Sequence, residues 1–297
     1  MLPTKYASTR NKERVRDEDT KLIKKEFIRR RQKLSYLGMP SGEMRDILAW
    51  RKYINRFTTV EIDDKQRREL VLNVIRNNLQ DRVDILFGDI EEILLKGKDQ
   101  YNNRLKFPYT IVFLDFFGSI LYRGFRRVKA IKALITKQTG NSFLLLLTFN
   151  LRERRYCKNV IMGVLKKIQK ELCSYYVYDE PTRKKVESIV SWYSSNTTSE
   201  VYRQKLFVPY FIKTTAEECN YKVHAYSPIF YRGYNNSPMI HFAFKLLPEF
   251  ESPTKTISEQ TIIDIINLNQ KEASRGRVFV KKNQAPLLNI LKSNLKV

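Results

Sequence analysis

The chain has 297 residues, of which 42% are hydrophobic, so it is long enough for a sizeable core in one large domain or in two. It carries 55 Lys and Arg against 31 Asp and Glu, a formal net charge of +24 that favours a polyanionic partner such as nucleic acid. Three scattered cysteines and two histidines exclude a disulfide framework and a Cys/His zinc site.

The hydrophobic runs are short. The longest, residues 142–149, cannot span a bilayer, and the first residues lack the apolar centre of a signal peptide. We therefore expect a soluble protein of the reducing cytoplasm, with no membrane partner and with the nucleus not excluded.

Residues 1–33 are predicted to form a basic N-terminal extension, because they hold twelve Lys and Arg against five acids. Apolar periodicity is weak there until residues 22–28. This pattern predicts a frayed end followed by a short basic helix.

Short apolar segments then alternate with amphipathic ones. Strands are predicted at residues 57–63, 82–88, 109–115 and 142–150, and helices at residues 64–78, 89–97 and 123–138. Strands that are apolar throughout and separated by helices indicate a parallel sheet covered on both faces. The predicted fold class is α/β, doubly wound, with a mostly parallel sheet.

Residues 151–206 are basic and mostly helical in pattern, which predicts an insertion or lid packed on the sheet. Residues 201–221 predict a helix that Pro209 kinks or restarts. From residue 251 the pattern predicts a C-terminal tail with one more helix and a basic stretch.

An antiparallel hairpin is predicted to close the sheet, with strands at residues 221–233 and 237–248. The connection Tyr234-Asn235-Asn236 suits residues at positive φ. His224 and His241 lie on these strands and are predicted to be hydrogen-bonded sheet residues rather than general bases, because the sequence shows no partner for base catalysis.

This order of elements resembles that of class I S-adenosylmethionine-dependent methyltransferases over residues 34–250. The resemblance rests on four segments that end successive strands: YLGMPSGE, VEID, FGDI and LDFFGS. It implies that the first strand is KLSYLG at residues 33–38 and that the fold is Rossmann-like, with the helical insertion at about residues 151–206.

The resemblance also implies S-adenosyl-L-methionine as cofactor. Gly38 and Gly42 would form the turn whose backbone N–H groups approach the methionine end of the cofactor. Glu61 would accept the ribose hydroxyls, as the acid after a Rossmann strand does, and Asp89 would meet the adenine amino group. Residues 39–41 separate the two glycines, which departs from the glycine-rich turn of the family.

The segment LDFFGS is similar to LDPFGS in tRNA dimethylguanosine methyltransferases. This similarity implies that Asp115 is the catalytic residue, which accepts a hydrogen bond from the target amine, and that Phe116 and Phe117 stack on the base. Phe116 stands where the family has proline, and proline would restrict the backbone of the acid before it. A simpler role for Asp115 is to cap its own turn.

Three arginines that follow this turn are predicted to contact phosphates of the substrate: Arg123, Arg126 and Arg127. The predicted function is methyl transfer to a base amino group of nucleic acid, with RNA favoured over DNA through the LDFFGS resemblance alone. The alternative is a catalytically inactive methyltransferase-fold subunit that binds nucleic acid or protein partners in a larger assembly. Hydrolase motifs such as HExxH or GxxxxGK[ST] do not occur in the sequence.

Overall fold

The structure, a computed structural model, describes residues 10–27, 33–121, 125–151, 200–233 and 236–249. Most of the predicted insertion, the predicted tail from residue 251 and Arg123 lie outside the described residues.

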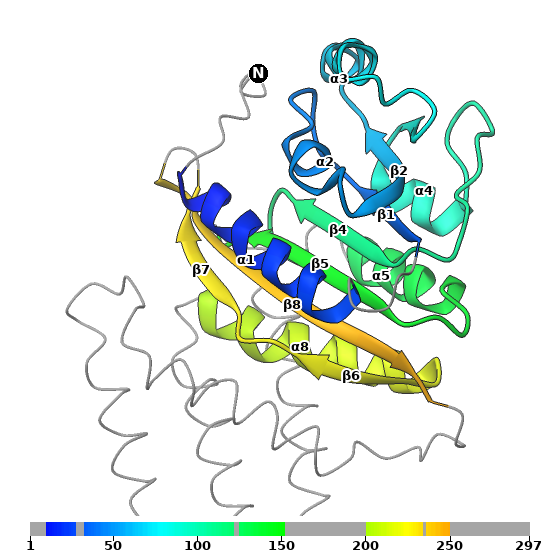
Figure 1. Cartoon of the computed structure of the whole chain (residues 1–297). Helices are drawn as coiled ribbons and strands as arrows, with labels where there is room; N and C mark the ends of the chain where they lie inside the picture. Colours follow the sequence, from blue (N-terminus) through cyan, green and yellow to red (C-terminus); the bar gives the residue numbers. More distant parts are fainter. Residues whose placement is uncertain (1–9, 28–32, 122–124, 152–199, 234–235, 250–297) are drawn as a thin grey trace, which may run out of the picture.

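The elements follow the predicted order closely (Figure 1). The helices are α1 (Arg10–Phe27), α2 (Arg45–Trp50), α3 (Asp64–Arg76), α4 (Ile90–Lys96), α5 (Arg126–Lys137) and α8 (Glu200–Glu218). The strands are β1 (Leu34–Gly38), β2 (Ile54–Glu61), β3 (Val83–Phe87), β4 (Ile111–Phe116), β5 (Phe143–Asn150), β6 (Tyr221–Ala225), β7 (Ile229–Arg232) and β8 (Pro238–Pro248).

All of these strands belong to one sheet with the order β3-β2-β1-β4-β5-β8-β6, and β7 also pairs with β8. Strands β1 to β5 are parallel, whereas β8 runs antiparallel to β5, β6 and β7. The predicted α/β class with a mostly parallel sheet and a closing antiparallel part is therefore confirmed.

The closing part differs from prediction in one respect. The single strand predicted at residues 221–233 is two strands, β6 and β7, which pair with different halves of β8. The break contains Pro228, which has no N–H to donate to a ladder. At the other end of β7, Asn236 has φ of 55°, as expected for the asparagine-bearing turn.

Both faces of the sheet are covered by helices, and β5 shows how one strand serves both. Phe143, Leu145 and Leu147 belong to the core under α4, α5 and α8, whereas Leu144 and Leu146 belong to the core under α1, α2 and α3. All five side chains are fully buried. This burial explains why the strand is apolar throughout, since each side chain contributes about 1.5–3 kcal/mol when removed from water.

The N-terminal segment is the main departure from the sequence expectation. Helix α1 has 18 residues and lies across one face of the sheet (Figure 1), so this part of the predicted extension packs as part of the domain. Its buried side chains recur every fourth residue at Val15, Asp19, Ile23 and Phe27. One of the four is an acid, which weakened the apolar periodicity in the sequence.

A buried polar chain ties α1 to the sheet. The Nε2 atom of His241 lies 2.9 Å from Asp19 Oδ1, and its Nδ1 atom lies 2.9 Å from Thr148 Oγ1. All three residues are about 1% exposed. His241 is therefore a hydrogen-bonded sheet residue, as predicted.

Helix α8 continues through Pro209 without interruption, so the predicted restart at this proline does not occur. Within the described residues, none of the helices is long and apolar enough to cross a membrane.

Candidate active site

The candidate site lies where the parallel strands end, and strand register shapes it. Gly38, the last residue of β1, pairs with Thr59 of β2 and with Phe113 of β4. Strands β2 and β4 both extend past the end of β1. Glu61 and Asp115 each stand two residues beyond the residue that pairs with Gly38. Ligands of open α/β sheets bind at this edge, where strand order reverses. The structure thus brings three predicted site residues to one edge.

Gly38 occupies a position that admits no other side chain. A Cβ atom there would lie 2.0 Å from the Tyr36 hydroxyl and 2.9 Å from the backbone oxygen of Phe113. Tyr36 is fully buried, its hydroxyl has no hydrogen-bond partner among the described residues, and burial raises its pKa well above the usual value. The glycine is therefore required for packing at the end of β1.

Gly42 contacts α3. Its N–H donates to Gln66 Oε1 at 3.0 Å, and its carbonyl accepts from Asn73 Nδ2 at 2.9 Å. A Cβ atom at Gly42 would lie 2.9 Å from the Cβ of Glu69. The turn after β1 is thus held against α3, and the N–H that was predicted to face a cofactor is bonded to Gln66.

Glu61 keeps acceptor capacity at the end of β2. Its Oε1 atom accepts the backbone N–H of Asp63 at 2.9 Å, and burial raises the pKa of the Glu61 carboxyl above its usual value. The next side chain, Ile62, is 61% exposed although it is apolar. A ligand that has hydroxyl groups as well as a flat ring suits this pair, because the carboxylate can accept from the hydroxyls and the apolar side chain can contact the ring.

Asp89 begins α4 as its N-cap residue. Its Oδ1 atom accepts the backbone N–H of Glu91 at 2.8 Å, and its Oδ2 atom lies 3.9 Å from Arg126 Nη2. The N–H of Gly88 donates to the carbonyl of Glu61 at 3.1 Å. This backbone bond places Asp89 and Glu61 on adjacent strand ends.

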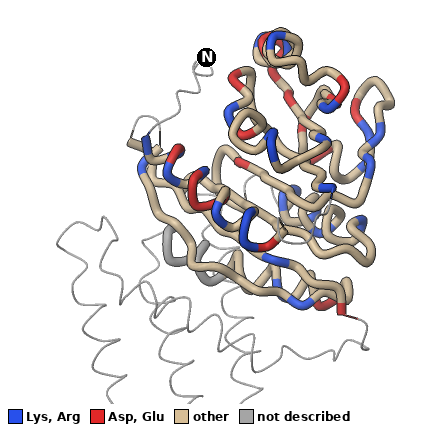
Figure 2. Tube along the Cα trace, viewed as in Figure 1, with Lys and Arg blue, Asp and Glu red and all other residues tan. Residues whose placement is uncertain are grey.

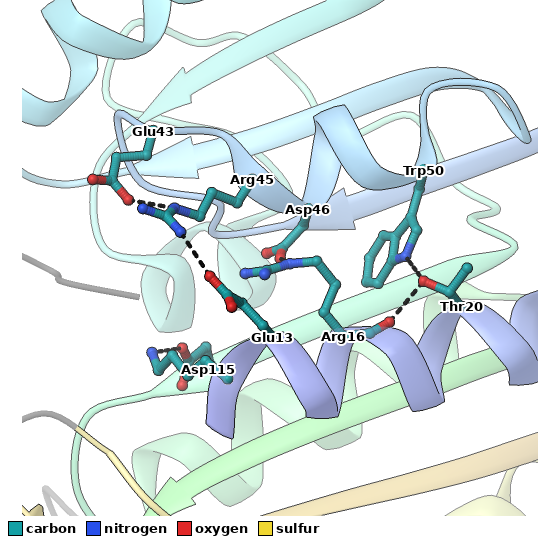
Figure 3. Close-up of polar contacts among 9 residues, drawn as sticks. Glu13, Arg16, Thr20, Glu43, Arg45, Asp46, Trp50 and Asp115 are labelled. Carbon is teal, nitrogen blue, oxygen red and sulfur yellow. Dashed lines mark hydrogen bonds and ion pairs between the residues drawn. The ribbon is translucent and has the colours of Figure 1, made fainter. Parts of the chain in front are cut away.

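Asp115, the residue that the resemblance makes catalytic, is bound by a side chain of α1. Lys12 Nζ lies 2.7 Å from Asp115 Oδ2, and each side chain is about one-quarter exposed (Figure 3). Within the described part of the chain, Oδ1 of Asp115 accepts no hydrogen bond. An ammonium group therefore already occupies one oxygen of this carboxylate.

The same end of α1 also holds the segment after β1. Arg16 donates to the buried Asp46 at 2.6 Å, and Glu13 lies 3.3 Å from Arg45 (Figure 3). Burial raises the pKa of Asp46 above its usual value, against the effect of Arg16. Helix α1 thus connects the start of α2, which follows β1, with the end of β4.

Arg127 fixes the turn after β4. Its guanidinium donates to the carbonyl oxygens of Ser119 at 2.6 Å and Phe117 at 3.0 Å, and pairs with Glu91 at 2.8 Å. It also lies 4.4 Å from the ring centroid of Phe116. Arg127 is only 4% exposed, so the arginine predicted to contact phosphate is instead a buried clamp of the turn.

The two phenylalanines of LDFFGS differ in exposure. Phe116 is buried and stacks on Phe149 with ring centroids 5.7 Å apart, so its ring is not presented to a substrate. Phe117, two residues after Asp115, is 63% exposed. Arg126 is half-buried and lies 3.5 Å from Glu92, which partly neutralises it.

Lys12 at this site had no signal in the sequence. It lies in the basic N-terminal segment, 103 residues from Asp115, and only the packing of α1 on the sheet joins the two. Ile62 had a weak signal, since it is an apolar residue between acids at the end of a strand.

No protein-family model matches the chain, and no curated protein matches it. Solved structures similar to it include a proposed RNA methyltransferase from Pyrococcus horikoshii, with 9% identity, TM-score 0.46, and coverage of 83% of this chain and 88% of the other. A second is the O-methyltransferase from Bacillus cereus in complex with SAH, with 11% identity, TM-score 0.43, and coverage of 82% of this chain and 84% of the other. A third is a proposed methyltransferase from Escherichia coli, with 9% identity, TM-score 0.45, and coverage of 84% of this chain and 92% of the other.

At such low sequence identities and TM-scores, these solved structures indicate nothing about the chemistry of this chain. The parallel strands β1 to β5 and the antiparallel strands beyond them form the predicted kind of sheet, mostly parallel with a closing antiparallel part. The described residues thus form a Rossmann-like α/β domain with helices on both faces of the sheet.

Proposed function

We propose that this protein is an S-adenosylmethionine-dependent methyltransferase that acts on an amino group of a nucleic-acid base. The observation that carries the proposal is the placement of Glu61 and Asp115 on either side of Gly38, at the edge where ligands of such sheets bind. One carboxylate is suited to a cofactor and the other to a substrate amine.

The side chains at this edge fit the cofactor. Glu61 retains acceptor capacity for the ribose hydroxyls, and Ile62 offers exposed apolar surface beside it. Asp89 stands on the adjacent strand end, where its carboxylate can accept from an adenine amino group. Gly38 lets the chain turn away from β1 without a side chain at this point.

The bound cofactor supplies an electrophilic methyl group. Asp115 Oδ1 would accept a hydrogen bond from the target amine and could hold the proton that the amine releases, while Lys12 retains Oδ2. The exposed ring of Phe117 provides a surface for the base. A positioned acceptor of this kind accelerates reactions because it is oriented before the substrate arrives.

Support for a nucleic-acid substrate comes from charge. Exposed basic residues of α1 alternate with acids along the helix (Figure 2) and include Arg10, Arg14, Lys21, Lys24 and Lys25. Because α1 also contacts Asp115 through Lys12, a polyanion bound to this helix would lie beside the proposed amine acceptor.

Calorimetric titration with S-adenosylmethionine and its demethylated product tests the cofactor. Transfer of labelled methyl groups to total cellular RNA and DNA tests the substrate, and nucleic-acid affinity should fall steeply with salt. Absence of cofactor binding at millimolar ligand would overturn the enzyme proposal.

The alternative of a non-catalytic subunit also has specific support. The N–H of Gly42 is bonded to Gln66, and Lys12 is bonded to Asp115. Nucleic-acid binding without cofactor binding would favour this alternative.

A further inference from the structure

Tyr101 is an exposed aromatic residue outside the candidate active site. It lies in the loop of residues 97–105 between α4 and β4, and 59% of its surface is exposed. Its ring is stacked against Phe87, the last residue of β3, with centroids 6.1 Å apart and planes 20° apart. The guanidinium of Arg67 lies 4.5 Å from the centroid of the same Phe87 ring. Three separate elements therefore meet at one ring system.

The loop that carries Tyr101 is held in one conformation by Asp99. This buried carboxylate accepts the backbone N–H groups of Tyr101 and Asn103, both at 2.8 Å, and that of Phe87 at 3.2 Å. Burial alone would raise the pKa of Asp99, but its hydrogen bonds outweigh burial and hold the pKa below the usual value. Tyr101 is thus positioned before any ligand binds.

Basic residues lie on both sides of Tyr101 in its loop. Lys98 and Arg104 flank Tyr101 on its own loop, are exposed, and pair with no acid among the described residues. Lys98 instead donates to Asn102. A fixed aromatic face beside unpaired cations suits a ligand with a flat ring and a phosphate backbone, because every base has a face that can stack.

We propose that Tyr101 is a stacking platform for an unpaired base of a single-stranded nucleic acid. The proposal rests on the nucleic-acid part of the proposed function and not on methyl transfer. Tyr101 stands beside edge strand β3, three strands from Asp115 on β4, which is about 14 Å at the usual strand spacing. The stacked base would therefore be a neighbour of the target base and not the target itself.

The test measures anisotropy of a labelled single-stranded RNA with the full-length protein and three variants. Tyr101→Ala should weaken binding about five- to a hundredfold, the usual value of one stacked base. Tyr101→Phe should bind within about twofold of wild type, because it keeps the ring. The control is Leu247→Ala, which removes an exposed apolar side chain of β8, a strand far from β3 in the sheet, and should bind as wild type does.

The salt dependence of binding should be the same for Tyr101→Ala and wild type, because stacking releases no counterions. The affinity for duplex RNA should be the same for Tyr101→Ala and wild type. The proposal is overturned if Tyr101→Ala binds single strands as wild type does, which is also the result expected of a surface for a protein partner. It is equally overturned if wild type binds no single strand, or if Tyr101→Ala loses cofactor affinity instead. Calorimetry with the cofactor reports separately on the methyltransferase proposal.

Discussion

The ends of β2 and β4 carry one carboxylate each, yet their surroundings differ. Asp115 on β4 is paired with Lys12, and the turn after it is clamped by the buried Arg127. Glu61 on β2 has no cationic partner among the described residues, and burial raises its pKa. Ion pairs with basic side chains thus hold the β4 end, whereas at the β2 end backbone N–H groups donate to the carboxylates of Glu61 and Asp63.

Because of this difference, the two carboxylates are expected to have different roles in the proposed site. A carboxylate without a cation can accept neutral hydroxyl donors with its full capacity, whereas a carboxylate held by an ammonium has one oxygen fixed and the other directed elsewhere. We therefore expect substitutions at β4 to affect turn stability and turnover, and substitutions at β2 to affect cofactor affinity.

Removing the clamp should have the largest effect. Arg127→Met leaves Glu91 buried without its partner at 2.8 Å and leaves two turn carbonyls without a donor, which should cost about 3–5 kcal/mol of unfolding free energy. Denaturant titration measures this loss of unfolding free energy. Arg126→Met is the matched control, because Arg126 is half-buried with ion pairs of 3.5–3.9 Å and should cost about 1 kcal/mol or less. Equal midpoints for the two variants would show that the clamp does not stabilise the turn.

Asp115→Ala should lower turnover about a hundredfold or more, because it removes the positioned acceptor. Asp115→Asn keeps an oxygen that can accept and should retain more activity. Cofactor affinity should change little in both variants. If Asp115 only caps its turn, Asp115→Ala would instead lower stability by about 1 kcal/mol with a proportionate loss of activity, so melting and methyl transfer are measured together.

At the β2 end, Glu61→Ala should weaken cofactor binding about tenfold or more, because hydrogen bonds to a charged acceptor contribute about 1.5–3 kcal/mol. Turnover at saturating cofactor should fall less. Calorimetry measures the cofactor affinity of Glu61→Ala and of Asp115→Ala, and each variant is the control for the other. Loss of affinity in Asp115→Ala but not in Glu61→Ala would reverse the roles of the two carboxylates.

The raised pKa of Glu61 leads to a pH dependence with a definite sign. The carboxylate form accepts the hydroxyls, so cofactor affinity should fall as the pH is lowered through a pKa that lies above the usual value of 4.5. Glu61→Gln should bind more weakly than wild type at neutral pH and lose this dependence. A profile that Glu61→Gln leaves unchanged would assign the titration to another group.

The strand ends could be predicted from sequence, but their partners could not. Glu61 and Asp115 were found because each ends an apolar run, and parallel strands bring such ends together. Arg126 and Arg127 are adjacent in sequence, yet helix phase leaves the first half-buried and buries the second. No local pattern distinguishes them. Nor does any local pattern place Lys12 on Asp115, since that contact depends on how α1 packs across the sheet.

The smallest expected effect concerns Lys12 itself. Its pair with Asp115 is partly exposed, so Lys12→Met should change stability by no more than about 1 kcal/mol. If Lys12 orients Asp115, the same substitution should lower turnover a few-fold in wild type and have no further effect in Asp115→Ala, because a positioning residue has nothing left to position. Lys132→Met is the control, since Lys132 on α5 pairs with Glu218 at the surface. An equal loss in both backgrounds would mean that Lys12 acts on the substrate directly, as one more cation for the phosphate backbone, and the β4 end would then owe its order to Arg127 alone.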